Sequence, residues 1–158
     1  MKYGSDALLP MKCRQFLVLL LILQSLLVLS GCTQAELNTH RQLWKSQGFE
    51  DYQYDFQWNC YCVPDFVKPV IVSVRNGAIA GVSFSEEGLP VDPSNFTRYH
   101  TIKGSFYFIQ DAIDRDAYEI SVTYDSEFGY PTSASIDYER YTVDEEMGFT
   151  AKQLVRKK

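Results

Sequence analysis

Apolar side chains recur at every second position in an aromatic-rich segment of this chain, residues 52–60. Tyr54, Phe56, Trp58 and Cys60 fall on one face if this segment is extended. A period of two is typical of a half-buried β-strand, because successive side chains of a strand point to opposite faces. The pattern therefore predicts a strand over 52–60.

A hairpin is expected after this strand. Pro69 opens the run 70–75, Asn76-Gly77 follows, and the run 78–84 returns. Asn-Gly between two runs that favour β-structure is a strong signal for a two-residue turn. We therefore predict two further strands, paired through this turn.

Two helices are expected, one before each set of strands. The first covers 35–46, ends at Gly48, and has its apolar contacts at Leu37, Leu43 and Trp44. The second runs from Ile102 to about Arg115, with Thr101 as its N-cap. Its apolar face repeats at helical spacing, through Ile102, Phe106, Ile109 and Ile113.

The order helix, strand, strand, strand then occurs twice. Residues 118–124 repeat the pattern of 54–60, Pro131 opens a strand over 132–139, and a last strand is expected over about 148–155. Neither half alone buries both its helix and its sheet. We therefore predict an α+β fold, in which two helix-plus-three-strand repeats (about 35–84 and 101–155) form one antiparallel sheet with two helices packed on one face. The connection 85–99, rich in Glu, Gly, Pro and Asp, is expected to be an exposed loop.

The first thirty residues predict export. Lys12 and Arg14 precede an apolar run of about fourteen residues, shorter than the roughly 20 that span a bilayer, as in a signal peptide. The run ends in Leu29-Ser-Gly-Cys32, which looks like a bacterial lipobox with Cys32 as the lipidated residue. We expect a lipoprotein signal peptide over 1–31, with Met11 as an alternative start, and a single domain over 32–158. The alternative is a plain membrane anchor with an incidental cysteine.

This processing would leave an acidic domain. With Lys2, Asp6, Lys12 and Arg14 removed, 12 basic and 19 acidic residues remain, a net charge of −7. Such a domain repels phosphate backbones, so we expect no nucleic acid partner. The expected location is the bacterial cell envelope, on the outer membrane facing the periplasm if the host has two membranes, and otherwise on the outer face of the cytoplasmic membrane.

Several motifs together resemble a catalogued bacterial family. They are Trp44, the segment 54–62 with its C-x-C pair, Pro69-Val70, Asn76-Gly77, 109–113, 122–125, 129–132 and 136–138. They are similar to the uncharacterised family catalogued as domain of unknown function 6174, whose members are small exported or lipid-anchored proteins. The resemblance covers about 44–149 and implies no activity.

Candidate catalytic and metal-binding residues are few. The chain has two histidines, His40 and His100, and no nucleophile-elbow motif. The paired carboxylates Asp125/Glu127 and Asp137/Glu139 and the acidic run 144–146 fit turns and solvated faces, and none has calcium-loop spacing. We therefore assign no catalytic residue, no cofactor and no metal ligand.

Tyrosine is frequent, with 11 residues, and most are expected in the core or in cross-strand pairs. Any tyrosines left on the open face of the sheet would form a recognition surface. Tyr99, Tyr107, Tyr130 and Tyr141 are not assigned to the core by the pattern.

Cys60 and Cys62 are the thiols that remain after processing. Two apart on an ideal strand, their Cα atoms would lie about 6.6 Å apart, at the upper edge of the disulfide range. A disulfide therefore needs a kink, for which Val63-Pro64 provides a strand end. Two buried thiols and a two-sulfur site for a soft metal such as Cu(I) are the alternatives.

These observations favour a non-catalytic envelope lipoprotein. Its partners would be the membrane, through the lipid on Cys32, and an envelope protein or small ligand. The alternative hypothesis is a thiol-redox or soft-metal-handling protein that acts through Cys60 and Cys62. A third hypothesis is an enzyme without a recognisable motif.

Overall fold

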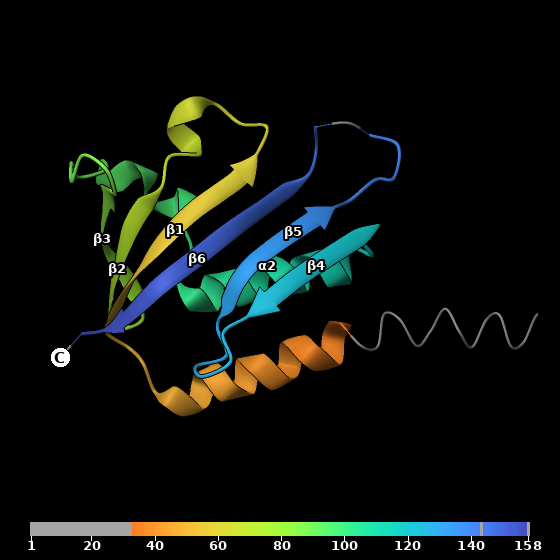
Figure 1. The fold of residues 1–158 in the computed structure, drawn as a ribbon, viewed down its shortest axis with the longest axis horizontal. Helices are drawn as coiled ribbons and strands as arrows, with labels where there is room; N and C mark the ends of the chain where they lie inside the picture. The colour runs from red at the N-terminus through yellow and green to blue at the C-terminus, as the bar shows by residue number, and fades with distance from the viewer. Residues whose placement is uncertain (1–32, 143, 158) are drawn as a thin grey trace, which may run out of the picture. The chain divides into compact units, whose positions relative to one another are not determined.

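Six strands form one antiparallel sheet in the computed structural model, which describes residues 33–142 and 144–157 (Figure 1). The strands are β1 (Tyr52–Cys60), β2 (Val70–Arg75), β3 (Ala78–Phe84), β4 (Glu119–Tyr124), β5 (Pro131–Asp137) and β6 (Met147–Arg156). Their order in the sheet is β3-β2-β1-β6-β5-β4. The predicted signal peptide and Cys32 lie outside the described residues.

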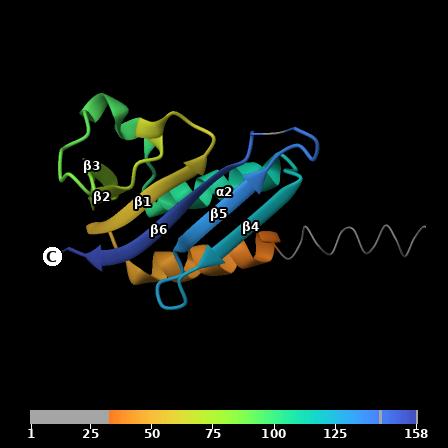
Figure 2. The ribbon, with the colours of Figure 1, turned by 45° about the horizontal axis from the view of Figure 1, so that its top comes forward.

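Both helices pack on the same side of this sheet, and its other face is open (Figures 1 and 2). The first helix is described over 33–47, and α2 covers Ile102–Asp114. Thr101 caps α2, since its side-chain oxygen accepts a hydrogen bond from the backbone N–H of Gly104 at 3.1 Å. The predicted α+β fold with one antiparallel sheet is therefore confirmed.

The two halves share an order of elements but hold different places in the sheet. β1, the first strand of the first half, lies in the centre between β2 and β6. β4, the first strand of the second half, lies at the edge and pairs with β5. The pairing of β1 with β6 closes the sheet across the two halves.

The core lies between the sheet and the helices. Every second residue of β1 from Tyr52 to Trp58 is buried, as the alternation predicts. Polar atoms of these side chains bond the segment before α2: the indole N–H of Trp58 donates to the backbone oxygen of Arg98 at 2.8 Å, and the Tyr54 hydroxyl donates to that of His100. These bonds fix the entry of the chain into α2, because a buried hydroxyl or indole N–H needs a partner.

The connection 85–99 is more ordered than its composition predicts. It bridges to β3 through Ser83 and Pro90, continues into the 3-10 helix η2 (Pro93–Arg98), and buries Val91 and Tyr99. The expectation of an exposed loop is therefore wrong at these two apolar positions, since both belong to the core cluster.

Two boundaries also differ from the prediction. The strand expected over 132–139 begins at Pro131 and ends at Asp137. Asp137 Oδ1 accepts a hydrogen bond from the backbone N–H of Glu139 at 3.0 Å, which turns the chain out of the sheet. A short 3-10 helix, η1 (Pro64–Phe66), follows β1. No helix among the described residues is long and apolar enough to cross a membrane.

Candidate functional site

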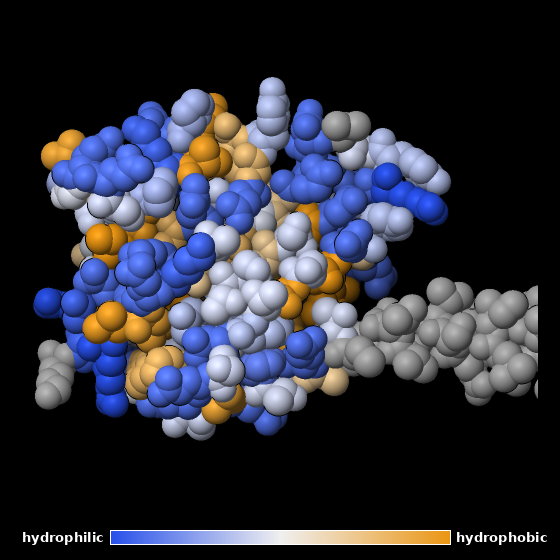
Figure 3. Space-filling model, in the orientation of Figure 1, coloured by the Kyte–Doolittle hydropathy of each residue, from blue (hydrophilic) through white to orange (hydrophobic). Residues whose placement is uncertain are grey.

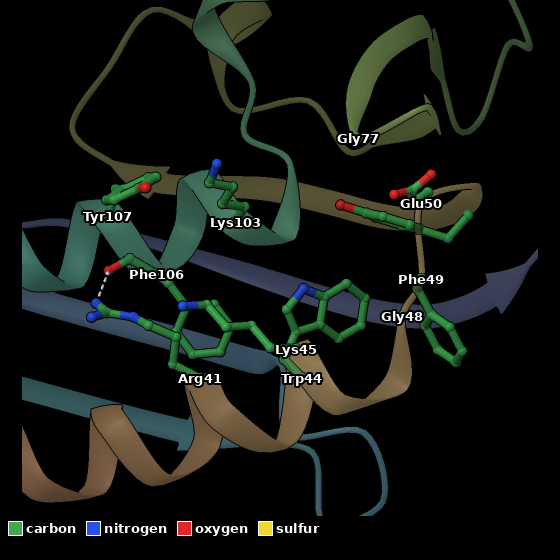
Figure 4. Close-up of a pocket in the computed structure, with 11 residues that line it drawn as sticks. Arg41, Trp44, Lys45, Gly48, Phe49, Glu50, Gly77, Lys103, Phe106 and Tyr107 are labelled. Carbon is green, nitrogen blue, oxygen red and sulfur yellow. Dashed lines mark hydrogen bonds between the residues drawn. The ribbon is translucent and has the colours of Figure 1, made fainter.

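A groove of about 450 Å³ lies where the first helix and α2 approach the start of β1 (Figure 4). Its walls carry three cations, Arg41, Lys45 and Lys103. Its aromatic lining consists of Trp44, Phe49, Tyr52, Phe106 and Tyr107. A volume of this size falls in the range of about 300–1,000 Å³ that is usual for small-ligand sites.

Helical spacing brings the groove's charged residues together. Arg41 and Lys45 are four residues apart, and so are Lys103 and Tyr107 of α2, so each pair lies on one face of its helix. Because the two helices pack side by side on the sheet, the two faces meet across the groove (Figure 4).

Arg41 is held in place by the facing helix. Its Nη2 donates to the backbone oxygen of Phe106 at 3.3 Å and to Oε1 of Gln110 at 3.1 Å. Gln110 Nε2 in turn donates to Oε1 of Gln34 at 2.7 Å. The guanidinium also lies 5.8 Å from the centre of the Phe106 ring. These contacts fix the direction of the guanidinium before any ligand arrives.

The groove's cations are not neutralised by nearby carboxylates. Within the described residues, the ion pairs closer than 4.0 Å are Lys68–Asp65 and Arg115–Asp111, and neither lies in the groove. Among the described residues, Glu50 is the single acidic residue of the lining. The groove is therefore a local excess of positive charge on an acidic protein.

Aromatic rings form the apolar surface of the groove. Trp44 packs edge-on against Tyr52 and Phe49, each with 5.4 Å between ring centres. Tyr107 is 60% exposed, and Lys103 Nζ lies 5.7 Å from its ring centre. Burial raises the pKa of Tyr52 to about 12, so its hydroxyl remains neutral and accepts a hydrogen bond from the N–H of Ile102 at 3.1 Å.

Two glycines shape the mouth of the groove. Gly48 ends the first helix with φ of +63°, and Gly77 completes the β2–β3 turn with φ of +72°. The Gly77 N–H donates to the backbone oxygen of Glu50 at 3.0 Å, which fixes the segment that carries the Glu50 side chain.

The sequence did not single out this groove. The sequence pattern assigns no role to Arg41, Lys45 or Lys103, and it leaves Tyr107 unassigned to the core. The sequence does contain one relevant signal, the spacing of four residues within Arg41/Lys45 and within Lys103/Tyr107. Only the fold shows that these two pairs face each other.

Cys60 and Cys62 are joined by a disulfide at the opposite end of β1. Their Cα atoms lie 5.3 Å apart, closer than the spacing of about 6.6 Å in an ideal strand, because β1 ends at Cys60 and the chain bends there. Cys62 is exposed, and Cys60 is partly buried. The groove lies near Tyr52, so a strand length of about 26 Å separates the two features.

The two histidines lie in different aromatic surroundings. His40 stacks on Tyr124 with 4.0 Å between ring centres. His100 is surrounded by rings, including Trp58 at 4.9 Å and Phe108 at 5.5 Å, and burial lowers its pKa to about 4. Within the described part of the chain, Nδ1 of either histidine has no hydrogen-bond partner.

The acidic pairs stabilise turns. Asp125 Oδ1 accepts from the backbone N–H groups of Glu127 at 3.0 Å and Phe128 at 2.7 Å, and Asp137 accepts from that of Glu139. The run 144–146 lies in the connection between β5 and β6. Among the described residues, no group of three or more His, Cys, Asp or Glu is placed to hold a metal ion.

The unassigned tyrosines divide into two groups. Tyr99 and Tyr130 are buried, whereas Tyr107 and Tyr141 are exposed, and of the four Tyr107 lines the groove. The tyrosines of the described strands, Tyr52, Tyr54 and Tyr124, all face the helices.

No tyrosine of the described strands is therefore left on the open face of the sheet, so the alternative of a tyrosine recognition surface there has no residues to form it. At β4 and β5 that face carries small hydroxyl side chains, as in the cluster of Thr123 with Thr132 and Ser133, each 2.8 Å away. Figure 3 shows its centre as a pale area of intermediate hydropathy. The large aromatic side chains lie on the face that packs against the helices, because they fill the core there.

In comparisons with known proteins, residues 36–156 match a family model described as "Family of unknown function (DUF6174)". The matched range contains the groove, the disulfide and all six strands. No curated protein and no solved structure matches the chain.

Proposed function

The chain belongs to the DUF6174 family, and on that premise we propose that it is a lipid-anchored protein of the bacterial cell envelope whose folded domain binds a ligand. The binding role is non-catalytic, and the groove between the first helix and α2 is the binding site. The resemblance to this family, inferred from the C-x-C pair and the motifs of the second half, is confirmed by the match over 36–156.

One observation carries the binding role. Arg41, Lys45 and Lys103 line a groove of about 450 Å³ together with the exposed ring of Tyr107, and no described carboxylate lies within 4.0 Å of their charged atoms. Aromatic surface with a few fixed polar groups is the usual composition of a ligand pocket. An anionic ligand would bind here more favourably than water does. Its charge would pair with the cations, and its contact with an aromatic ring would add to the binding free energy.

The anchor rests on the sequence. Lys12 and Arg14, the apolar run and Gly31-Cys32 are typical of a lipoprotein signal peptide. Cys32 would carry the lipid one residue before the described helix begins. The lipid would place the domain on the outer membrane of a two-membrane host, facing the periplasm, or on the outer face of a single membrane.

Membrane fractionation of Cys32→Ala tests the anchor. We expect the variant to leave the membrane fraction or to accumulate as an uncleaved precursor. Normally processed, membrane-bound Cys32→Ala protein would contradict the anchor and leave the binding site unaffected.

Native mass spectrometry of the full chain in detergent tests the binding role. The wild type, incubated with the low-mass fraction of an envelope extract, should carry a bound mass that the double variant Arg41→Gln/Lys45→Gln lacks. Lys152→Gln is the matched control, since Lys152 is an exposed cation of β6 outside the groove. Equal retention by all three proteins would contradict the role of the groove.

The exposed disulfide supports a second candidate function. Cys62 is accessible, so the Cys60–Cys62 pair is open to thiol exchange, and its reduced form would offer two sulfurs to a soft metal. Redox or metal-handling activity through this pair would be independent of the groove, because the two lie at opposite ends of β1.

A further inference from the structure

We propose that the groove binds short acidic peptides, with their carboxylates at Arg41 and Lys45 and their free amino group at Glu50. This inference rests on the proposed function, since it takes the groove as the ligand site and names the class of ligand.

The balance of charge in the groove favours an anion. In the part of the chain that the structure describes, three cations line the groove with one carboxylate, so a ligand with more acidic than basic groups complements the site. The chain as a whole carries a net charge of −5, which repels an extended anionic surface such as a phospholipid membrane. A small anion that enters the groove avoids this repulsion, because the local cations are nearest to it.

The end of the groove near Phe106 suits a carboxylate. Arg41 Nη2 already donates to Phe106 and Gln110, which orients the guanidinium and leaves further N–H donors for a ligand. A guanidinium binds a carboxylate through two parallel hydrogen bonds. Figure 4 shows Lys45 extending toward the same end, so a second positive charge supports the first.

The opposite end suits an amine. Glu50 lies there beside Gly77, away from Arg41 (Figure 4). Its backbone oxygen accepts the Gly77 N–H at 3.0 Å, and among the described residues no cation lies within 4.0 Å of its carboxylate. The protonated amino group of a peptide supplies the charge that this carboxylate lacks.

Between the two ends, the ligand meets rings. Trp44 forms the floor, and Tyr107 forms an exposed wall that a peptide side chain or backbone can cover. A groove of about 450 Å³ accommodates a short peptide but not a folded partner. The groove is lined by aromatic side chains and has charges of opposite sign at its two ends. This arrangement therefore points to a peptide with both termini free.

Calorimetric titration of the full chain in detergent tests this assignment. The probes are the tripeptide Ala-Glu-Glu, its N-acetylated form, inorganic phosphate and vesicles containing phosphatidylglycerol. We expect the free tripeptide to bind, with an affinity that falls as salt is added. Lys45→Gln should weaken binding about tenfold, as expected for a charge-assisted hydrogen bond, while Lys152→Gln should leave it unchanged.

The amino end has its own test. N-acetylation should weaken binding to the wild type, and Glu50→Gln should remove that difference between the acetylated and the free tripeptide. Equal affinity of the wild type for both forms would contradict the placement of the peptide's amino group at Glu50.

The remaining outcomes separate the ligand class from the proposed function. Binding of phosphate, or of vesicles containing phosphatidylglycerol, that depends on Lys45 while the tripeptide fails to bind would overturn the peptide assignment and keep the groove as an anion site. If no probe binds, and the envelope extract yields no bound mass that Arg41→Gln/Lys45→Gln loses, both the inference and the proposed function are contradicted.

Discussion

Arg41 of the first helix donates a hydrogen bond to the backbone oxygen of Phe106 in α2, with 3.3 Å between Nη2 and that oxygen. The bond joins the two helices across the groove, so the same residue fixes the width of the groove and presents a charge to it. Lys45, one turn further along, lines the groove without such a bond among the described residues.

This difference predicts that replacing Arg41 destabilises the protein more than replacing Lys45 does. Arg41→Ala should lower the free energy of unfolding by about 1.5 kcal/mol, since hydrogen bonds made by a charged group contribute about 1.5–3 kcal/mol and this one is only part-buried. Lys45→Ala should change it by less than about 0.5 kcal/mol. Urea unfolding of both variants measures the two values, and equal losses would contradict the structural role given to Arg41.

The core prediction concerns Trp58, which is 4% exposed and packs against Phe108 and His100. Trp58→Ala should lower the free energy of unfolding by about 3–5 kcal/mol, a large part of the 5–15 kcal/mol typical of a domain. Tyr61→Ala is the control, because Tyr61 is 84% exposed three residues away. A Trp58→Ala protein that melts within a degree or two of the wild type would show that this face is not the core.

His100 should make stability depend on pH. Burial lowers its pKa from 6.5 to about 4, so between these values the unfolded chain takes up a proton that the folded chain does not. The free energy of unfolding should therefore fall as the pH drops below about 6.5, by about 1 kcal/mol at pH 5.5, with no contribution from His100 above pH 7.5.

Urea unfolding between pH 7.5 and 5.5 measures this slope, in a range where most carboxylates stay ionised. His100→Phe keeps a ring in the cluster and removes the titrating group, so its slope should be flatter. An unchanged slope in His100→Phe would assign the pH dependence to other groups.

The state of the thiols is decided by alkylation and intact mass. With the Cys60–Cys62 bond closed, protein purified from the envelope without reductant should take up no alkylating reagent at these positions, and two equivalents after reduction. Two modified thiols before reduction would rule the disulfide out in the cell and favour the soft-metal alternative. Cys60→Ser/Cys62→Ser is the control for labelling elsewhere.

Much of the fold could be predicted because local and global signals agree. The alternation around Trp58, the Asn76-Gly77 turn and the Thr101 cap each specify one conformation, and the structure has all three. The connection 85–99 was harder, because its many polar residues hide Val91 and Tyr99, which pack only when the sheet is present.

The groove could not be predicted for a different reason. Lys103 and Arg41 are sixty-two positions apart, and each looks like an ordinary surface cation of its own helix. They line one site because both helices pack on the same face of the sheet. Sequence spacing gives the face of each helix, while the sheet order decides which faces meet.

The two tryptophan side chains offer the most direct measurement of the groove as the ligand site. In a ¹H–¹⁵N NMR titration of the full chain with Ala-Glu-Glu, the indole signal of Trp44, which lines the groove, should shift with saturation. The signal of Trp58, whose N–H is bonded to Arg98 in the core, should stay in place. A titration in which the Trp44 signal does not move, while backbone signals around Thr123 on the open face do, would contradict the account.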